Sequence, residues 1–164
     1  MNWAWCLRFL DLAHVIAMNS KDPSTRVGAV IANDKKLVVG MGFNGFPRGV
    51  VDSAERYNSR EEKYPRIVHA EVNAILNAVA AVQGCSLFGT HFPCTDCAKV
   101  IIQSGIGHVI TPAPSADMLD RWGRSFDITK SMFEEAGVDV MIARNYQPPR
   151  YFPYDNTLVF LDRK

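Results

Sequence analysis

The chain has 164 residues, 48% of them hydrophobic, which predicts a single globular domain spanning residues 1–164. Its formal net charge of only +1 gives no general attraction for phosphate backbones, so we expect a small-molecule partner and no long nucleic acid. The sequence has neither a basic leader followed by a long apolar run nor an apolar stretch of membrane-spanning length, which predicts a soluble, cytoplasmic protein with no membrane partner.

The N-terminal part of the chain predicts one helix and a pair of strands. Apolar groups recur at helical spacing from Trp3 to Asn19, and the run Ser20–Pro23 ends this helix. Apolar and β-branched residues at 27–32 and 37–41 predict two strands. The polar residues 33–36 between them predict a turn, so the two strands are expected to pair antiparallel.

The middle of the chain predicts loops, a buried helix and a strand. Glycines punctuate residues 42–49, which predicts a loop. Residues 51–66 have mixed charge and little periodicity, which favours a solvated surface excursion, with a cover over the active site as the alternative. Alanines and aliphatics at 69–82, followed by Gly84, predict a buried helix with His69 on its first turn, and residues 86–92 predict a strand.

The C-terminal part predicts two further helices and two further strands. Pro93 is suited to the opening of a helix that runs to Ile102. Residues 108–111 predict a strand, 126–136 a helix and 138–143 a last strand, and the tail that follows matches no element. This alternation predicts an α/β fold with a mixed central sheet of about five strands covered by helices, with the functional site at helix N-termini.

Two short motifs combine three zinc ligands with one carboxylate. His69 lies two residues before Glu71, and Cys94 and Cys97 follow Pro93 at the spacing of a Cys-x-x-Cys pair. A structural zinc site normally has four protein ligands, whereas a catalytic site has three and leaves one position to water. Only three are evident here, so we predict catalytic Zn²⁺ with Glu71 as the acid–base residue. A helix N-terminus favours the thiolate form that metal binding needs.

The remaining cysteines carry no spacing signal. Of four cysteines, Cys6 and Cys85 are predicted to be buried thiols that behave as small apolar side chains. A second zinc site built from them with His14 or His108 is an alternative without a motif behind it. The Cys-x-x-Cys pair by itself would also fit a redox pair, but the nearby His and Glu favour the metal.

The pattern His-x-Glu followed by Pro-Cys-x-x-Cys is the signature of the zinc nucleobase deaminases. Several longer segments also resemble the cytidine and deoxycytidylate deaminase family, in order and in spacing, over roughly residues 7–143. The matching segments are SKDPSTRVGAVI (20–31), GFNGFP (42–47), KYP (63–65), HAEVNAI (69–75) and FPCTDCAKVIIQSGI (92–106).

The resemblance implies a cytidine-deaminase-like three-layer fold and zinc-dependent deamination of dCMP to dUMP and ammonia, with dCTP as an additional substrate. It implies that Asn44 contacts the sugar 3′-hydroxyl, that Val27 and Phe92 line the base pocket, and that the Ala70 backbone meets the ring. It also implies a homo-oligomer, often a hexamer, activated by dCTP and inhibited by dTTP. Mg²⁺ would then accompany the nucleoside triphosphate effector.

A monophosphate substrate needs a cationic or amide-rich partner. Arg26 directly precedes Val27 and is therefore the first candidate for the phosphate. Arg48, Arg121 and Arg124 are weaker candidates that we expect to be surface charges. The sequence does not decide whether His91 faces the substrate or the core.

Two other functions remain open from the sequence alone. An editing deaminase acting on tRNA or single-stranded DNA would need a basic stripe with interleaved aromatics, which the near-neutral charge disfavours. A non-catalytic, zinc-stabilised nucleotide-binding subunit would have no use for Glu71. Both alternatives therefore rank below a nucleotide deaminase.

Overall fold

Five strands form one mixed sheet in the computed structural model, which describes residues 2–148. Across the sheet the order is β2 (Val38–Phe43), β1 (Gly28–Ala32), β3 (Ser86–Gly89), β4 (His108–Pro112) and β5 (Asp139–Ala143). Strand β1 is antiparallel to both neighbours, whereas β3, β4 and β5 run parallel. The predicted mixed sheet of about five strands is thus confirmed, and residues 149–164 of the predicted domain lie outside the described residues.

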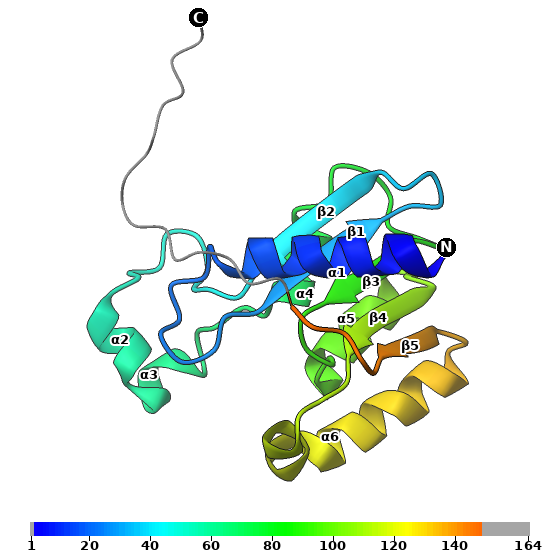
Figure 1. Cartoon of the computed structure of the whole chain (residues 1–164). Helices are drawn as coiled ribbons and strands as arrows, with labels where there is room; N and C mark the ends of the chain where they lie inside the picture. The colour runs from blue at the N-terminus through cyan, green and yellow to red at the C-terminus, as the bar shows by residue number, and fades with distance from the viewer. Residues whose placement is uncertain (1, 149–164) are drawn as a thin grey trace, which may run out of the picture.

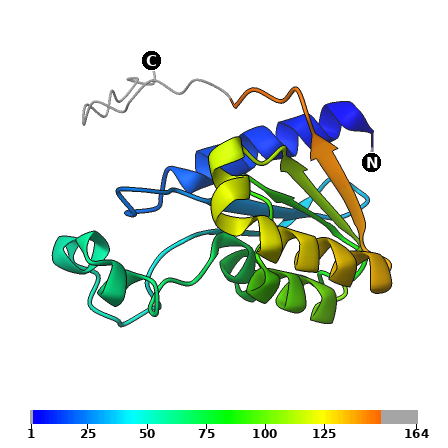
Figure 2. The same ribbon diagram turned by 90° about the horizontal axis from the view of Figure 1, so that it is seen from below.

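Helices cover both faces of this sheet and make three layers (Figure 2). Helix α1 (Trp3–Ala17) lies on one face, and α4 (Ala70–Leu76), α5 (Thr95–Gln103) and α6 (Ala116–Glu135) lie on the other. Successive strand residues point to opposite faces, and all five residues of β1 are buried. Ala29 and Ile31 belong to the core under α4 and α5, while Val30 and Ala32 pack with α1. A continuous apolar strand is therefore the pattern that a sheet covered on both sides requires.

Two glycines bring helices directly against the sheet. A Cβ atom on Gly28 would lie 2.1 Å from the carbonyl oxygen of Ala13 in α1. A Cβ atom on Gly42 would lie 2.3 Å from the backbone nitrogen of Ala74 in α4. No larger residue fits at either position without displacing a helix backbone. Because α4 begins directly after His69, its contact with β2 also fixes the position of the zinc motif.

Helix α4 is shorter than the sequence predicts, ending at Leu76 and not at residue 82. After Asn77 the chain turns back to β2, where the Val79 N–H donates to the Val39 carbonyl at 2.8 Å. Leu76 and Val79 are exposed, so no core holds a longer helix in place. The aliphatic periodicity that predicted a longer helix belongs in part to surface residues.

Helix α6 is longer than predicted and begins at Ala116, ten residues before residue 126. The Ser115 hydroxyl caps it by accepting the Met118 N–H at 3.3 Å. The first turns escaped prediction because Gly123 interrupts the pattern and because Leu119 and Trp122 are exposed and not part of the core. None of the helices within residues 2–148 is long and apolar enough to cross a membrane.

Residues 51–66 form a largely exposed excursion, as predicted, but it contains two short helices. Helices α2 (Ala54–Asn58) and α3 (Arg60–Lys63) project together from one end of the molecule (Figure 1). Tyr57 and Lys63 are buried despite the polar sequence around them. Tyr57 stacks on Phe46 with ring centroids 4.6 Å apart, which attaches α2 to the glycine-rich loop.

Candidate active site

Three ligand side chains meet where α4 and α5 begin. His69 is the N-cap residue of α4 and Cys94 the N-cap residue of α5, and neither side chain makes a capping hydrogen bond. His69 therefore precedes the first turn on which we expected it. Its Nδ1 lies 3.5 Å from Cys94 Sγ and 3.3 Å from Cys97 Sγ. The two helix starts thus hold three ligand atoms within 4.8 Å of one another.

The chemistry and spacing of these donors fit zinc. Bond lengths of about 2.0–2.3 Å in a tetrahedral site place ligand atoms roughly 3.3–3.8 Å apart, as found here. No fourth histidine, cysteine or carboxylate joins this group within the part of the chain that the structure describes. Three protein ligands leave a fourth position for a small molecule, as in catalytic zinc sites.

The two cysteines shift each other's pKa through a shared hydrogen bond. The hydrogen bond from the Cys97 thiol lowers the pKa of Cys94 to about 4, and its bond to His69 adds to that shift. The same Cys97–Cys94 bond, together with burial, raises the pKa of Cys97. Cys94 is therefore a thiolate at neutral pH, stabilised by the Cys97 thiol and by His69. The site is electronically prepared for a cation.

Glu71 lies on the first turn of α4 beside the ligands. It is buried, and one carboxylate oxygen accepts from Cys97 Sγ at 3.5 Å. Burial is the largest influence on this carboxyl group and raises its pKa. A raised pKa makes a carboxylate a stronger base, which suits a residue that must take a proton from water and return it later.

A pocket opens over this centre. It is lined by the loop after α1, Asn44 directly after β2, the end of α3, the segment that leads into α4 and the first turn of that helix, the segment before α5, and α6. The lining residues are Asp22, Ser24, Thr25, Val27, Asn44, Lys63, Tyr64, Ile67, His69, Ala70, Glu71, His91, Phe92, Cys94, Met118, Arg121, Trp122 and Phe126. Four of the five residues predicted to bind substrate are in this set, namely Val27, Asn44, Ala70 and Phe92.

Asn44 is buried and fixed by backbone hydrogen bonds. Its Oδ1 accepts the Val27 N–H at 2.8 Å, and its Nδ2 donates to the Thr25 carbonyl at 2.9 Å. One amide hydrogen and one lone pair remain for a ligand. The side chain is therefore oriented before any substrate arrives.

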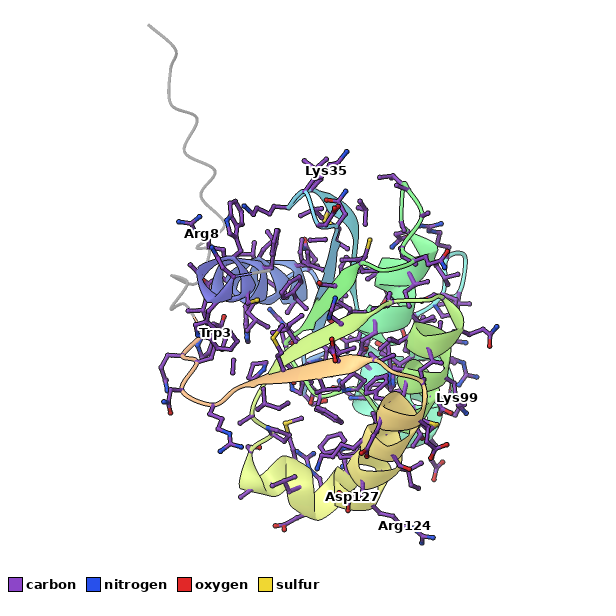
Figure 3. The ribbon with its side chains drawn as sticks, turned by 90° about the vertical axis from the view of Figure 1, so that its right-hand side faces the viewer. Trp3, Arg8, Lys35, Lys99, Arg124 and Asp127 are labelled. Carbon is purple, nitrogen blue, oxygen red and sulfur yellow. The ribbon has the colours of Figure 1, made fainter. Side chains whose placement is uncertain are left out.

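The predicted arginines lie in different places. Arg26 is exposed and is not among the residues that line the pocket. Arg48 donates to Asn77 Oδ1 at 2.6 Å, away from the ligand cluster. Arg124 extends outward from α6 near Asp127 (Figure 3). Arg121, which we expected at the surface, is exposed but lines the pocket.

The pocket wall contains a buried ion pair that was not predicted from the sequence. Lys63 Nζ lies 3.1 Å from Asp22 Oδ1 and 2.7 Å from Ser24 Oγ. Asp22 also accepts the N–H groups of Ser24 and Thr25, at 2.9 and 3.2 Å. This network joins α3 to the loop after α1, and Tyr64 and Ile67 extend the same wall. The excursion of residues 51–66 therefore also contributes to the pocket wall at its C-terminal end, through Lys63 and Tyr64.

The model of the cytidine and deoxycytidylate deaminase zinc-binding region matches residues 4–113. The chain is 48% identical to an uncharacterised deaminase from the luxG 3′ region of Aliivibrio fischeri, over 83% of this chain and 91% of that protein. It is 42% identical to the deoxycytidylate deaminase of Mus musculus, over 82% of this chain and 76% of that one.

Among solved structures, the dCMP deaminase of cyanophage S-TIM5 in complex with dCMP and dUMP matches with a TM-score of 0.69 and 26% identity. The match covers 87% of this chain and 98% of the phage protein. The family model covers the whole ligand cluster, and the fold and the site geometry agree with it. This chain belongs to the cytidine and deoxycytidylate deaminase family.

Proposed function

We propose that this protein is a zinc-dependent deaminase that converts dCMP and water to dUMP and ammonia, and so supplies dUMP for thymidylate synthesis. The observation that carries the proposal is the buried Glu71 beside the cluster of His69, Cys94 and Cys97, at a pocket. The names of the mouse deoxycytidylate deaminase and of the phage dCMP deaminase support the choice of dCMP.

The zinc ligands and Glu71 carry out the chemistry in this proposal. His69, Cys94 and Cys97 hold zinc, which when bound lowers the pKa of a water molecule toward neutrality. Glu71 accepts one proton from water and delivers it to the cytosine ring nitrogen. It then takes the second proton of that water from the hydroxyl group added to the ring and passes it to the departing amine. The reaction is hydrolytic, so Glu71 ends each cycle in its starting protonation state.

The remaining residues position the nucleotide. Val27 and Phe92 form apolar walls for the base, and the backbone of Ala70 meets its edge at the first turn of α4, where N–H groups lack helical partners. Asn44 offers its remaining amide hydrogen and lone pair to the sugar 3′-hydroxyl. Preorganisation of Asn44 by Val27 and Thr25 supports this role, because a fixed group loses little entropy on binding.

The direct test measures ammonia release from dCMP, dCTP, cytidine and a cytosine-containing oligonucleotide side by side. We expect dCMP to have the highest kcat/KM and the oligonucleotide to give no measurable product. Preferential turnover of the oligonucleotide would replace the proposal with an editing deaminase. No turnover of any substrate by the zinc-loaded protein would favour a nucleotide-binding subunit.

We propose further that the protein acts as a homo-oligomer, a hexamer by family resemblance, in the cytoplasm. Exposed apolar side chains on neighbouring elements support self-association, because such a group is unusual on a monomer. They are Met41 and Phe43 on β2, and Leu76 and Val79 on and after α4.

In this proposal dCTP activates and dTTP inhibits, with Mg²⁺ brought by the effector's phosphates. At subsaturating dCMP, dCTP should raise the rate and dTTP should lower it, because each binds one state of the oligomer more tightly. Initial rates across a range of effector concentrations measure this. Hyperbolic kinetics that neither nucleotide changes would contradict the regulation and leave the deaminase proposal intact.

A further inference from the structure

One face of α6 lines the pocket from the metal centre to the solvent. Met118, Trp122 and Phe126 line the pocket at intervals of four residues, so they share one side of the helix. The exposed fraction is 3% for Phe126 and 47% for Trp122. The ring of Phe126 meets the ring of Phe92 edge-on, with centroids 5.1 Å apart. Phe92 itself lies two residues before the ligand Cys94. The buried end of this face therefore lies next to the metal centre and the other end at the pocket mouth.

Arg121 places a guanidinium group at the mouth. Its side chain is 54% exposed and is held by Asp117, one turn earlier on the same helix. The Arg121 Nε–H donates to the Asp117 carbonyl at 3.2 Å, and Nη2 pairs with its carboxylate. A guanidinium has five N–H donors, so three remain for a ligand. An exposed pair of this kind is weak and does not prevent Arg121 from binding a phosphate dianion.

The other cations near the pocket are less suited to this role. Lys63 lines the pocket, but its side chain is only 7% exposed and its charge is balanced by Asp22. Arg26 is exposed and lies outside the pocket lining. Among the described residues, Arg121 is thus the arginine that combines a place in the pocket with unused donors.

His91 adds a second polar group near Arg121. The ring lines the pocket, and its Nδ1 lies 3.0 Å from the Thr90 hydroxyl, which leaves Nε2 for a ligand. Burial lowers the pKa of His91, and the charges of His14 and Arg121 lower it further. His91 is therefore neutral at pH 7. Because Thr90 also accepts the Gly28 N–H at 3.1 Å, its own hydrogen can go to Nδ1, and Nε2–H is then a donor.

On the basis of the proposed function, we propose that Arg121 binds the 5′-phosphate of the substrate, with His91 Nε2 as a neighbouring donor. Phosphate recognition in this chain then comes from the first turns of α6 and not from the loop that carries Arg26. The base lies at the metal centre, the sugar passes Asn44, and the phosphate reaches the mouth.

The test compares phosphorylated and unphosphorylated ligands with the zinc-loaded Arg121→Ala protein. A lost charge-assisted contact should lower kcat/KM for dCMP by about 10- to 150-fold and leave the low activity on deoxycytidine within about twofold. The dissociation constant for dUMP should rise by a similar factor, while that for deoxyuridine stays unchanged. Calorimetry with dUMP and deoxyuridine measures phosphate binding without turnover. It therefore tests the role of Arg121 even if dCMP is not the substrate.

Arg124→Ala is the matched control, because Arg124 is on the same helix and points outward (Figure 3). It should leave both ligand classes unaffected. Equal losses for dCMP and deoxycytidine in Arg121→Ala would overturn the inference and make Arg121 a support for α6. A selective loss in Arg26→Ala with none in Arg121→Ala would overturn it in favour of Arg26. Wild-type protein that binds dUMP no more tightly than deoxyuridine would exclude the subsite altogether.

Discussion

Replacing Glu71 by glutamine is expected to remove nearly all turnover while zinc content and fold stay unchanged. The amide keeps the shape of the carboxyl group but can neither accept the water proton nor return it. An ordinary acid–base residue contributes about 10²–10⁴-fold to the rate. Because several transfers pass through Glu71 in each cycle, we expect a loss beyond this range. Steady-state kinetics with dCMP, and elemental analysis on the same sample, measure both quantities.

The geometry separates a chemical role of Glu71 from a structural one. Glu71 touches Cys97 Sγ at 3.5 Å but does not belong to the three-ligand group. Glu71→Gln should therefore retain about one zinc per chain and its affinity for dUMP. Glu134→Gln makes the same chemical change at an exposed position of α6 and should keep full activity. Zinc loss in Glu71→Gln would make the residue a support for the metal centre, and substantial residual turnover would remove it from the proton transfers.

The metal centre was predictable because its residues lie in two short segments of the sequence. His69 and Glu71 are separated by one residue, as Cys94 and Cys97 are by two, and each pair lies at the start of a helix. Short spacings on a helix determine which side chains are neighbours almost independently of the rest of the fold. Only the meeting of the two helix starts depends on the sheet, because both helices cover the same face of it.

The pocket wall was not predictable in the same way. Lys63 and Asp22 are 41 residues apart, and nothing in either local sequence marks the pair. The first turns of α6 did carry a signal, since Ser115 follows two prolines and precedes helix-forming residues. That signal was outweighed because Trp122 faces the pocket mouth and not the core, which breaks the amphipathic pattern. A residue that is used for binding can violate a pattern that reflects packing.

Arg26 and Arg121 illustrate the same limit. Arg26 was preferred because it adjoins Val27, but both residues precede β1 in the loop after α1, where adjacency does not determine which way a side chain points. Val27 lines the pocket and Arg26 does not. Arg121 is distant from every motif in the sequence and reaches the pocket only through the packing of α6 on α5, where Ser125 Oγ accepts the Thr95 N–H at 3.2 Å. Adjacency in sequence was therefore a poor guide to adjacency in the pocket.

Cys97→Ala is expected to abolish zinc binding and, with it, deamination. The thiol is buried beside His69 and Cys94, so its removal leaves two ligands for an ion that prefers four. Loss of zinc returns the pKa of the reacting water from about 7 toward about 15.7, so turnover should become undetectable. Zinc per chain should fall from about one to near zero by elemental analysis.

The matched control is Cys85→Ala, because Cys85 is also buried but does not belong to the ligand cluster, and its thiol donates to the Ala81 carbonyl at 3.7 Å. It removes the same atom from a comparable environment, so it should cost similar packing energy and still keep zinc and activity. Comparing the two variants separates loss of the ligand from loss of a buried sulfur. Full zinc occupancy in Cys97→Ala would mean that another protein group completes the coordination. A fourth protein ligand in the wild type would leave no position for the reacting water. Either result would contradict a hydrolytic centre built from His69, Cys94 and Cys97.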